Sequence, residues 1–282
     1  MEFPKVSIII LNWNGLKDTI ECLESLKKIM YPNYEVIVVD NNSSGKDASV
    51  INRKFKNYIK LIKNEKNYGF TKGNNIGAKY AKGDYLLFLN NDTIVEKDFL
   101  KFLVDALEKN KKAGIGMPVI FDYYSKEIQT SGNSFLMTGK VRLKNIYPSD
   151  LISEVDYASG AALIIKRSNF ERLNGFNEKL FMYGEDLDLS LRNKNVLKKI
   201  NVCVKNSHVY HKGSVSVKKK STKWLIEHET YGRFYNILYN YAGLERIVRV
   251  LLFVSASLIL NFCEFFKYRN LRIKIMMAVI FT

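Results

Sequence analysis

Short continuous apolar runs punctuate the first 95 residues and predict buried strands. The runs occupy residues 6–11, 34–39, 59–62 and 85–89 and are rich in Val, Ile, Leu and aromatic residues. Polar and apolar positions do not alternate within them. Such runs are typical of strands in a parallel sheet that is covered on both faces.

Helix-like segments separate these runs. Apolar residues recur every three positions within residues 16–29, and residues 71–82 contain small residues that allow close packing. With right-handed crossovers, the resulting β-α-β-α-β order predicts a mixed, mostly parallel α/β sheet with helices on both faces. Ligands of such sheets bind beyond the carboxyl ends of the strands. The segments that follow the strands therefore predict where a site lies.

The second half of the chain predicts further strands and then helices. Residues 114–166 contain two strand candidates around a polar middle, residues 167–173 predict a short helix, and residues 199–204 predict one more strand. We expect one α/β domain over residues 1–220 and a helical, basic extension over residues 221–282.

Polar segments follow all four early strands. They read Asn12-Trp13-Asn14-Gly15, Asp40-Asn41-Asn42-Ser43-Ser44, Asn64-Glu65-Lys66-Asn67-Tyr68-Gly69 and Asn90-Asn91-Asp92. Each alone is an ordinary turn or helix-capping sequence. Because the carboxyl ends of parallel strands share one edge, the four segments together predict a single polar site there.

Two carboxylates in these segments suit the recognition of a nucleotide. Asp40 can accept hydrogen bonds from a pyrimidine base or a ribose, although it can equally cap the helix that follows. Asp92 can bind a hard divalent cation, Mg²⁺ or Mn²⁺, because such ions take oxygen ligands. The amides of Asn90 and Asn91 can hold a sugar or a phosphate beside it.

The third segment leads into glycines at positions 69, 73 and 77. This spacing lacks the G-x-G-x-x-G dinucleotide fingerprint and argues against a nicotinamide enzyme. It places Gly73 and Gly77 on one helix face, where they predict tight packing against the sheet. Polar groups nearby come from Asn67, Lys72 and Asn74.

Acidic residues crowd the start of a predicted helix at Glu185, Asp186 and Asp188, where the helix dipole favours ionised carboxylates. We expect Asp188 and Arg192, four residues apart, to pair on the surface. Glu185 or Asp186 would then lie in a partly desolvated cleft, where a raised pKa lets a carboxylate accept a proton from an attacking hydroxyl. Simple placement of charge at a helix N-terminus is the alternative.

Two histidines follow the last predicted strand. His208 and His211 are three residues apart, so an extended segment points them to opposite faces, and a shared metal ion is not expected. His211, with Gly213 and Ser214, can approach a diphosphate or complete the ligands of a metal ion. For His208 we predict a structural role.

The composition supports a folded protein and narrows its chemistry. The 282 residues are 47% hydrophobic, and the three widely spaced cysteines support neither a disulfide framework nor a zinc site. The net charge is +16, of which residues 193–282 carry +12 from 16 Lys or Arg and 4 Asp or Glu. A basic segment suits nucleic acid, an anionic membrane or simply a Lys-rich composition.

The basic extension also carries apolar stretches. Residues 222–241 place aromatic and aliphatic residues at helical spacing, which predicts packing on the α/β domain. Residues 250–263 are uncharged, but a membrane span needs about 20 residues, so we expect a helix lying in the interface. With the basic Lys218, Lys219 and Lys220 nearby and no leader peptide expected, we predict a cytoplasmic protein held at the inner face of an anionic membrane. A homodimer through these helices is the alternative.

Taken together, the motifs resemble the family 2 glycosyltransferases with the GT-A fold, and in particular their rhamnosyltransferase-like branch. The likeness covers residues 4–215 and is carried by residues 11–15, 39–43, 67–70, 89–93 and 184–188. It implies transfer of a sugar from a nucleotide-sugar donor to a glycan or lipid-linked acceptor. The implied chemistry is a single displacement that inverts the anomeric carbon.

The residues and the resemblance give three groups of candidates. Asp186 and Glu185 are the candidate catalytic bases. The candidate metal ligands are Asp92 and His211. The candidate nucleotide-sugar-binding residues are Asn12, Asn14, Asp40, Asn42, Asn67, Gly69, Lys72, Asn74, Asn90 and Asn91.

Two departures from the family bear on the chemistry. Its metal motif is D-x-D, whereas the first position here is Asn90, so only Asp92 carries over as a metal ligand. The Q-x-x-R-W string of processive synthases does not occur, which predicts a non-processive enzyme.

Two other functions stay open. A nucleotidyltransferase would need a glycine-rich phosphate loop after the first strand, which residues 12–15 do not offer. A non-catalytic module would bind a nucleotide sugar or a nucleic acid. The acidic residues 185–188 would repel a phosphate backbone, so we do not predict nucleic acid as a partner.

Overall fold

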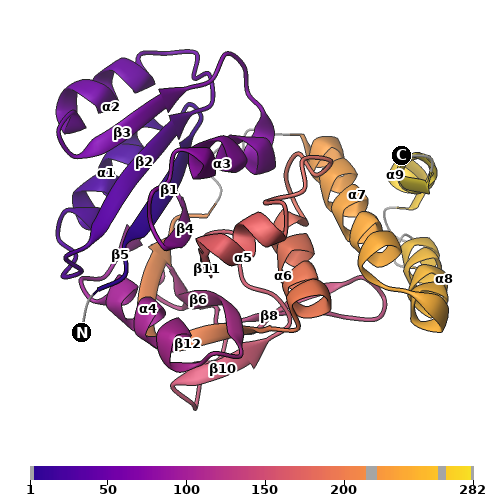
Figure 1. The fold of residues 1–282 in the computed structure, drawn as a ribbon. Coiled ribbons are helices and arrows are strands. Elements are labelled where there is room, and N and C mark those ends of the chain that lie inside the picture. Colours follow the sequence, from indigo (N-terminus) through magenta and orange to yellow (C-terminus); the bar gives the residue numbers. More distant parts are fainter. Residues whose placement is uncertain (1–2, 214–220, 260–264, 281–282) are drawn as a thin grey trace.

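The computed structural model describes residues 3–213, 221–259 and 265–280 (Figure 1). Its strands are β1 (Val6–Asn12), β2 (Tyr34–Asp40), β3 (Ile59–Lys63), β4 (Tyr85–Asn90), β5 (Thr93–Val95), β6 (Ala113–Asp122), β7 (Ile128–Thr130), β8 (Asn133–Phe135), β9 (Val141–Leu143), β10 (Ile152–Val155), β11 (Ala162–Lys166) and β12 (Ile200–His211). Its helices are α1 (Leu16–Leu26), α2 (Asp47–Phe55), α3 (Gly69–Lys79), α4 (Phe99–Lys109), α5 (Arg167–Arg172), α6 (Glu185–Leu197), α7 (Thr222–Asn240), α8 (Gly243–Ile259) and α9 (Phe265–Ile280).

The main sheet runs in the order β10-β12-β6-β11-β4-β1-β2-β3, with β5 paired to β12 and β7 to β6. The four early strands are parallel, as predicted, and Asn12 lies in register with Asp40 and Leu11 with Asn90. Their polar ends therefore share one edge. Strand β11 is antiparallel to both β4 and β6, which makes the sheet mixed. The predicted mixed, mostly parallel sheet with helices on both faces is confirmed.

Two apolar layers cover the sheet and explain why the early strands carry continuous apolar runs. On one face, Ile8 and Ile10 pack with α1, α2 and α4. On the other face, Ile9 packs in a cluster with residues of α3, α5 and α6. Alternate side chains of β1 thus enter different layers, so both sets are mainly apolar, and the buried Ser7 donates its hydroxyl to Glu35 Oε1 at 2.6 Å.

Glycines set how closely α3 approaches β1. A Cβ atom at Gly73 would lie 2.6 Å from Leu11 Cδ1, and one at Gly77 would lie 2.6 Å from Ile9 Cγ2. The predicted close packing is confirmed. It holds the N-terminus of α3, and with it Gly69, at the carboxyl edge of the sheet.

The last predicted strand is longer than expected. Strand β12 continues to His211 through a register shift between Val204 and His208, so both histidines lie within the strand rather than after it. They point to different surroundings, as predicted. His208 contacts Glu96 through Nδ1 at 3.1 Å and Tyr147 through Nε2 at 3.0 Å, away from the site.

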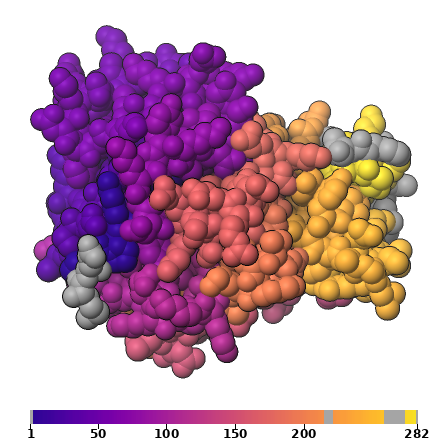
Figure 2. All heavy atoms as spheres, viewed as in Figure 1, coloured from indigo at the N-terminus to yellow at the C-terminus, as the bar shows by residue number. Residues whose placement is uncertain are grey.

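The C-terminal helices gather beside α6, away from β2 and β3 (Figures 1 and 2). A third apolar cluster joins them to α6 and β8 through residues such as Phe234, Ile237 and Phe253. The predicted packing of residues 222–241 is thereby confirmed. No helix among the described residues is both long and apolar enough to cross a membrane. The Lys218–Lys220 cluster and the end of the 250–263 stretch lie outside the described residues.

One predicted ion pair forms, but not on the surface. Arg192 Nε lies 2.7 Å from Asp188 Oδ2, and the Asp188 residue is only 2% exposed. The prediction of a surface pair was wrong because α7 packs over this part of α6. Asn240 Nδ2, at the end of α7, donates to Asp188 Oδ1 at 3.0 Å.

Candidate active site

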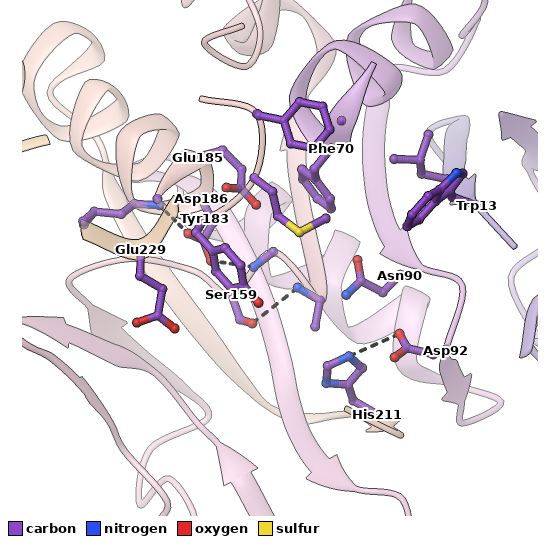
Figure 3. A pocket seen from close by; sticks show the side chains of 18 of the residues that line it. Trp13, Phe70, Asn90, Asp92, Ser159, Tyr183, Glu185, Asp186, His211 and Glu229 are labelled. Carbon is purple, nitrogen blue, oxygen red and sulfur yellow. Dashed lines mark hydrogen bonds and ion pairs between the residues drawn. The ribbon is translucent and has the colours of Figure 1, made fainter. Parts of the chain in front are cut away.

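A cavity of about 560 Å³ opens at the carboxyl edge of the parallel strands (Figure 3). Its lining comes from segments far apart in the chain. The β1–α1 loop contributes Trp13, and the end of β4 contributes Asn90, Asn91 and Asp92. Further lining residues come from the start of α3, residues 157–161, residues 181–187, β9, β12 and α7.

The predicted metal ligands meet in this cavity. His211 Nε2 lies 3.2 Å from Asp92 Oδ1, and both residues are 7% exposed. The pairing of β12 with β5 brings them together, because His211 is in register with Thr93. The other ring nitrogen, Nδ1, lies 2.9 Å from Gln129 Oε1.

This pair has the composition of a partial cation site. The buried Nε2 atom of His211 has no hydrogen-bond partner within the described residues, although it faces a carboxylate. Imidazole nitrogen and carboxylate oxygen both bind Mn²⁺ and related ions. The Gln129 contact at the other ring nitrogen fixes the orientation of the His211 ring, as is common for histidines that bind metal ions. The described residues contain no cluster of three or more His, Cys, Asp or Glu able to hold a metal ion. A cation here would complete its ligands with water or with groups of a substrate.

The two asparagines before Asp92 differ in what they contact. Asn91 Nδ2 donates to Thr19 Oγ1 at 2.9 Å and ties the end of β4 to α1. A Cβ atom at Gly15 would lie 2.4 Å from this same Nδ2, so the β1–α1 loop passes directly over it. Asn90 lies across the cavity from the acidic pair (Figure 3).

The acidic pair at the start of α6 lies on the opposite side. Asp186 accepts hydrogen bonds from the backbone N–H groups of Gly160 at 2.9 Å and Leu187 at 2.8 Å. Glu185 is 7% exposed, and its Oε2 has no hydrogen-bond partner in the described part of the chain. The two carboxyls are thus held differently.

Burial acts on both carboxyls. It raises the pKa of Glu185 to about 8, with the adjacent Asp186 charge adding to the effect. Burial also raises the pKa of Asp186, but the N–H groups of Gly160 and Leu187 stabilise its ionised form and oppose the rise. At neutral pH, Asp186 is therefore the better candidate for a free carboxylate and Glu185 for a protonated acid.

A left-handed turn places this pair. Tyr183 has φ 71° and Gly184 has φ 87°, immediately before α6. A Cβ atom at Gly184 would lie 2.9 Å from Gly232 Cα of α7. Glycine is needed here both for its backbone conformation and for the close approach of α7.

Asp40 and its neighbours form a buried network beside the cavity. Asp40 is 4% exposed, and its Oδ1 accepts hydrogen bonds from Asn12 Nδ2 at 2.8 Å and Ser43 Oγ at 2.6 Å. Asn14 Oδ1 accepts from the Ser44 N–H at 2.8 Å, which joins the two loops. Neither Asn12, Asn14 nor Asp40 lines the cavity within the described residues. Asn42 is exposed nearby.

The candidates around α3 divide in the same way. Asn67 and Gly69 line the cavity, and Asn67 Oδ1 accepts from Asn41 Nδ2 at 2.8 Å. Asn74 Nδ2 donates to Phe70 O within its own helix at 3.0 Å. Lys72 Nζ lies 3.8 Å from Glu178 Oε2, outside the cavity lining as described.

Sequence reasoning missed a whole wall of the site. Trp224, Glu229 and Arg233 of α7 line the cavity, as do Val141 and Leu143 of β9. The spacing of Trp224 within an apolar pattern indicated core packing, and Glu229 and Arg233, four residues apart, resemble an ordinary surface pair. The only available signal was that Trp224 is one of two tryptophans in the chain.

The β8–β9 hairpin connects this wall to α8. Its turn packs so tightly that a Cβ atom at Gly139 would lie 2.3 Å from Phe253 Cδ2. Arg249 Nη1 donates to Leu136 O at 3.3 Å, and its guanidinium carbon lies 3.8 Å from the Tyr241 ring centroid. The hairpin thus reaches from α8 to the cavity.

Comparison with known families gives a match over more than half of the chain. The sequence model described as "Glycosyl transferase family 2" matches residues 7–173. Rhamnosyltransferase WbbL of Escherichia coli K12 is 31% identical over 208 residues, which cover 66% of this chain and 76% of that protein. O-antigen biosynthesis protein RfbC of Myxococcus xanthus is 30% identical over 233 residues, covering 76% of this chain. The chain spans only 18% of the length of RfbC.

Solved structures share the fold at lower identity. GalNAc-T7, solved with UDP, GalNAc and Mn²⁺, has a TM-score of 0.67 at 17% identity and covers 89% of this chain and 55% of that one. TarS of S. aureus in complex with UDP-GlcNAc has a TM-score of 0.64 at 20% identity, over 88% of this chain and 70% of that one. Mannosyltransferase PcManGT of Pyrobaculum calidifontis, with GDP-Man and Mn²⁺, has a TM-score of 0.64 at 17% identity, over 99% of this chain and 74% of that one.

Proposed function

Because the chain belongs to glycosyl transferase family 2, we propose that it transfers a sugar from a nucleoside-diphosphate sugar to a hydroxyl group of a glycan or a lipid-linked acceptor. One observation carries the proposal. A candidate cation site, Asp92 with His211, and a buried carboxyl pair, Glu185 with Asp186, line the same cavity. Rhamnose is the first donor sugar to test, because the Escherichia coli relative is named a rhamnosyltransferase.

The donor diphosphate would lie at the Asp92 end of the cavity. Asp92 and His211 would hold Mg²⁺ or Mn²⁺, with further ligands from the diphosphate. Structures of GalNAc-T7 and PcManGT contain Mn²⁺, which supports a divalent cation here. When bound, such an ion supplies positive charge that stabilises the leaving diphosphate. Asn90, beside Asp92, can donate its amide hydrogens to the same group.

Asp186 would act as the base. The acceptor hydroxyl oxygen attacks the anomeric carbon, the bond from that carbon to the diphosphate oxygen breaks, and the hydroxyl proton passes to the Asp186 carboxylate. A single displacement of this kind inverts the anomeric centre. The N–H groups of Gly160 and Leu187 hold Asp186 in one orientation, which places its free lone pairs for the transfer. Glu185, with its raised pKa, stays protonated and adds no second negative charge.

The nucleoside would lie against the loops that follow β1, β2 and β3. Asp40 remains our candidate for contacting the base, and Asn12 and Ser43 hold its carboxylate still. Asn67 and Gly69 reach the cavity from the start of α3. Asn14 and Asn42 lie in the flanking loops.

We also propose that α8 docks on an anionic membrane. Leu244, Ile247 and Leu251, at helical spacing, are 76%, 55% and 61% exposed. Exposed Arg246 on α8 and Lys274 on α9 add positive charge. An amphipathic helix of this kind lies in the interface of a membrane without spanning it.

Vesicle flotation tests the membrane proposal. The full chain should float with vesicles that contain anionic lipid, and the triple substitution Leu244→Gln, Ile247→Gln and Leu251→Gln should abolish flotation. Size-exclusion chromatography in the same buffer tests the homodimer. A dimer that the triple variant disrupts, without any flotation of the parent, would contradict the membrane proposal.

A donor screen tests the enzymatic proposal. Purified full-length protein is incubated with UDP-, GDP- and dTDP-sugars, with and without Mg²⁺ or Mn²⁺, and release of the nucleoside diphosphate is measured. Slow hydrolysis of one donor, dependent on the cation, is expected, and Asp186→Asn should lower its rate. Absence of both hydrolysis and nucleotide binding across the panel would refute the proposal.

A further inference from the structure

Helix α7 lines the cavity away from Asp92 and the loops after β1, β2 and β3, where we place the donor. Trp224, Glu229 and Arg233 line it from this helix. In Figure 3, Glu229 lies on one side of the cavity and Trp13 on the other, with Glu185 and Asp186 between them. Since the base has to lie within hydrogen-bond reach of the acceptor hydroxyl, the acceptor has to rest near Asp186, and α7 lines the cavity on that side.

Helix α7 packs directly against the Tyr183–Gly184 turn that precedes α6. A Cβ atom at Gly232 would lie 2.2 Å from the Tyr183 carbonyl oxygen, so helix and turn are in backbone contact. Asn236 Nδ2 donates to Gly184 O at 2.9 Å across this contact. Because these contacts are made to the backbone of the turn, they fix the position of α7 relative to Asp186.

Two aromatic side chains face this part of the cavity. The Trp224 ring centroid lies 6.2 Å from that of Tyr183, and the two rings are inclined at 64°. Trp224 also stacks on His228 with the centroids 3.9 Å apart. Tyr183 keeps a left-handed φ of 71°, an unfavourable conformation for a non-glycine residue that persists where the surroundings enforce it.

The polar groups of this wall suit neutral hydroxyls. Arg233 Nη2 lies 2.7 Å from Glu229 Oε2, so the two charges offset each other. The nearby Asp186 carboxylate disfavours a phosphate group at this position. A pyranose ring has an apolar C–H face that packs on aromatic rings and hydroxyl groups that pair with carboxylate and guanidinium groups.

We propose that α7 and the preceding turn form the acceptor subsite, in which Trp224 and Tyr183 pack against a neutral pyranose ring while Glu229 and Arg233 bind its hydroxyl groups. The inference rests on the proposed sugar transfer and names the chemical class of the group next to the reacting hydroxyl. A saccharide residue, rather than the phosphate of a lipid carrier, occupies this wall.

The two tryptophans of the chain make the subsite measurable. In the Trp13→Phe variant, Trp224 is the sole source of tryptophan fluorescence. It is titrated with methyl glycosides of glucose, galactose, rhamnose and N-acetylglucosamine, each in the presence of UDP, dTDP or GDP and Mn²⁺. We expect saturable quenching or a spectral shift with at least one glycoside.

Further substitutions in the Trp13→Phe background show whether the subsite residues cause the signal. Tyr183→Ala should lower the affinity for the glycoside about tenfold, which is the loss expected for one stacked aromatic contact. Tyr239→Ala is the matched control, because Tyr239 is an exposed aromatic residue of α7 and does not line the cavity as described. It should leave the titration unchanged.

The donor half is tested separately by thermal shift of the unmodified protein with the three nucleoside diphosphates and Mn²⁺. Stabilisation by a nucleotide, together with no response of Trp224 to any glycoside, overturns the acceptor subsite and leaves the proposed function standing. A response of Trp224 to inorganic pyrophosphate but not to glycosides also overturns it. No stabilisation by any nucleotide counts against the proposed function itself.

Discussion

Replacing Glu185 by Gln should stabilise the protein at pH 8 but not at pH 5. The carboxyl is 7% exposed and Oε2 has no hydrogen-bond partner within the described residues, so its ionised form is disfavoured. Below the ordinary pKa of 4.5, folded and unfolded chains both hold the proton. As the pH rises, the unfolded chain ionises first, so the stability of the unsubstituted protein falls until the folded carboxyl also ionises near pH 8.

The size of the effect follows from the difference between the folded and unfolded pKa values of Glu185. A pKa raised from 4.5 to about 8 corresponds to roughly 5 kcal/mol of stability lost across that interval. Glutamine does not ionise, but its buried amide needs hydrogen-bond partners of its own, which offsets part of the gain. The linkage gain is about 4 kcal/mol at pH 8 but only about 1 kcal/mol at pH 5, whereas the amide cost is about the same at both. We therefore expect the free energy of unfolding to rise by about 2 kcal/mol at pH 8 and to fall by about 1 kcal/mol at pH 5.

Urea unfolding, followed by circular dichroism at both pH values, measures this difference. The exposed Glu171→Gln on α5 is the control for replacing a surface carboxyl by an amide. A gain from Glu185→Gln that is equal at both pH values, or larger at the lower one, would refute the assignment of Glu185 as the protonated member of the pair. Activity is measured separately, because the substitution lies beside the base.

Three further predictions concern the framework of the site. His211→Ala should weaken Mn²⁺ binding in the presence of nucleoside diphosphate by at least about tenfold, measured by calorimetry, whereas Asp186→Asn should not; equal losses would contradict the ligand role. Gly232→Ala should cost about 1–3 kcal/mol of stability and lower turnover, because its Cβ collides with the Tyr183 carbonyl; a neutral thermal melt would be inconsistent with that contact. Lys212→Met should cost about 2 kcal/mol, because the Lys212 side chain is 5% exposed and pairs with two acids of α1; a salt-insensitive, unchanged melting temperature would argue against it.

The parallel half of the fold was predictable because its signals are local. Ile8, Ile9 and Ile10 are apolar because two layers cover β1, and that requirement appears directly as a continuous run. Gly73 and Gly77 revealed close packing because their spacing matches one helix face. The polar strand ends indicated the edge at which the site lies.

The rest of the site depends on contacts that the sequence does not encode locally. His211 meets Asp92 only because β12 continues past a register shift to pair with β5, and the pattern at residues 199–204 gave no sign of that. Asp188 with Arg192 had the spacing of a surface pair, and burial came from a helix some fifty residues away. Glu229 and Arg233 face a cavity for the same non-local reason.

The β8–β9 hairpin sets a lower limit on how far the chain can be trimmed. The family model matches residues 7–173, yet the hairpin that borders the cavity packs against Phe253 and Arg249, far beyond that range. A fragment that ends before α8 would keep every loop on the donor side of the cavity. It would lose the helix against which the β8–β9 hairpin packs. Minimal catalytic fragments of this protein therefore have to retain the helix whose outer face we assign to the lipid surface.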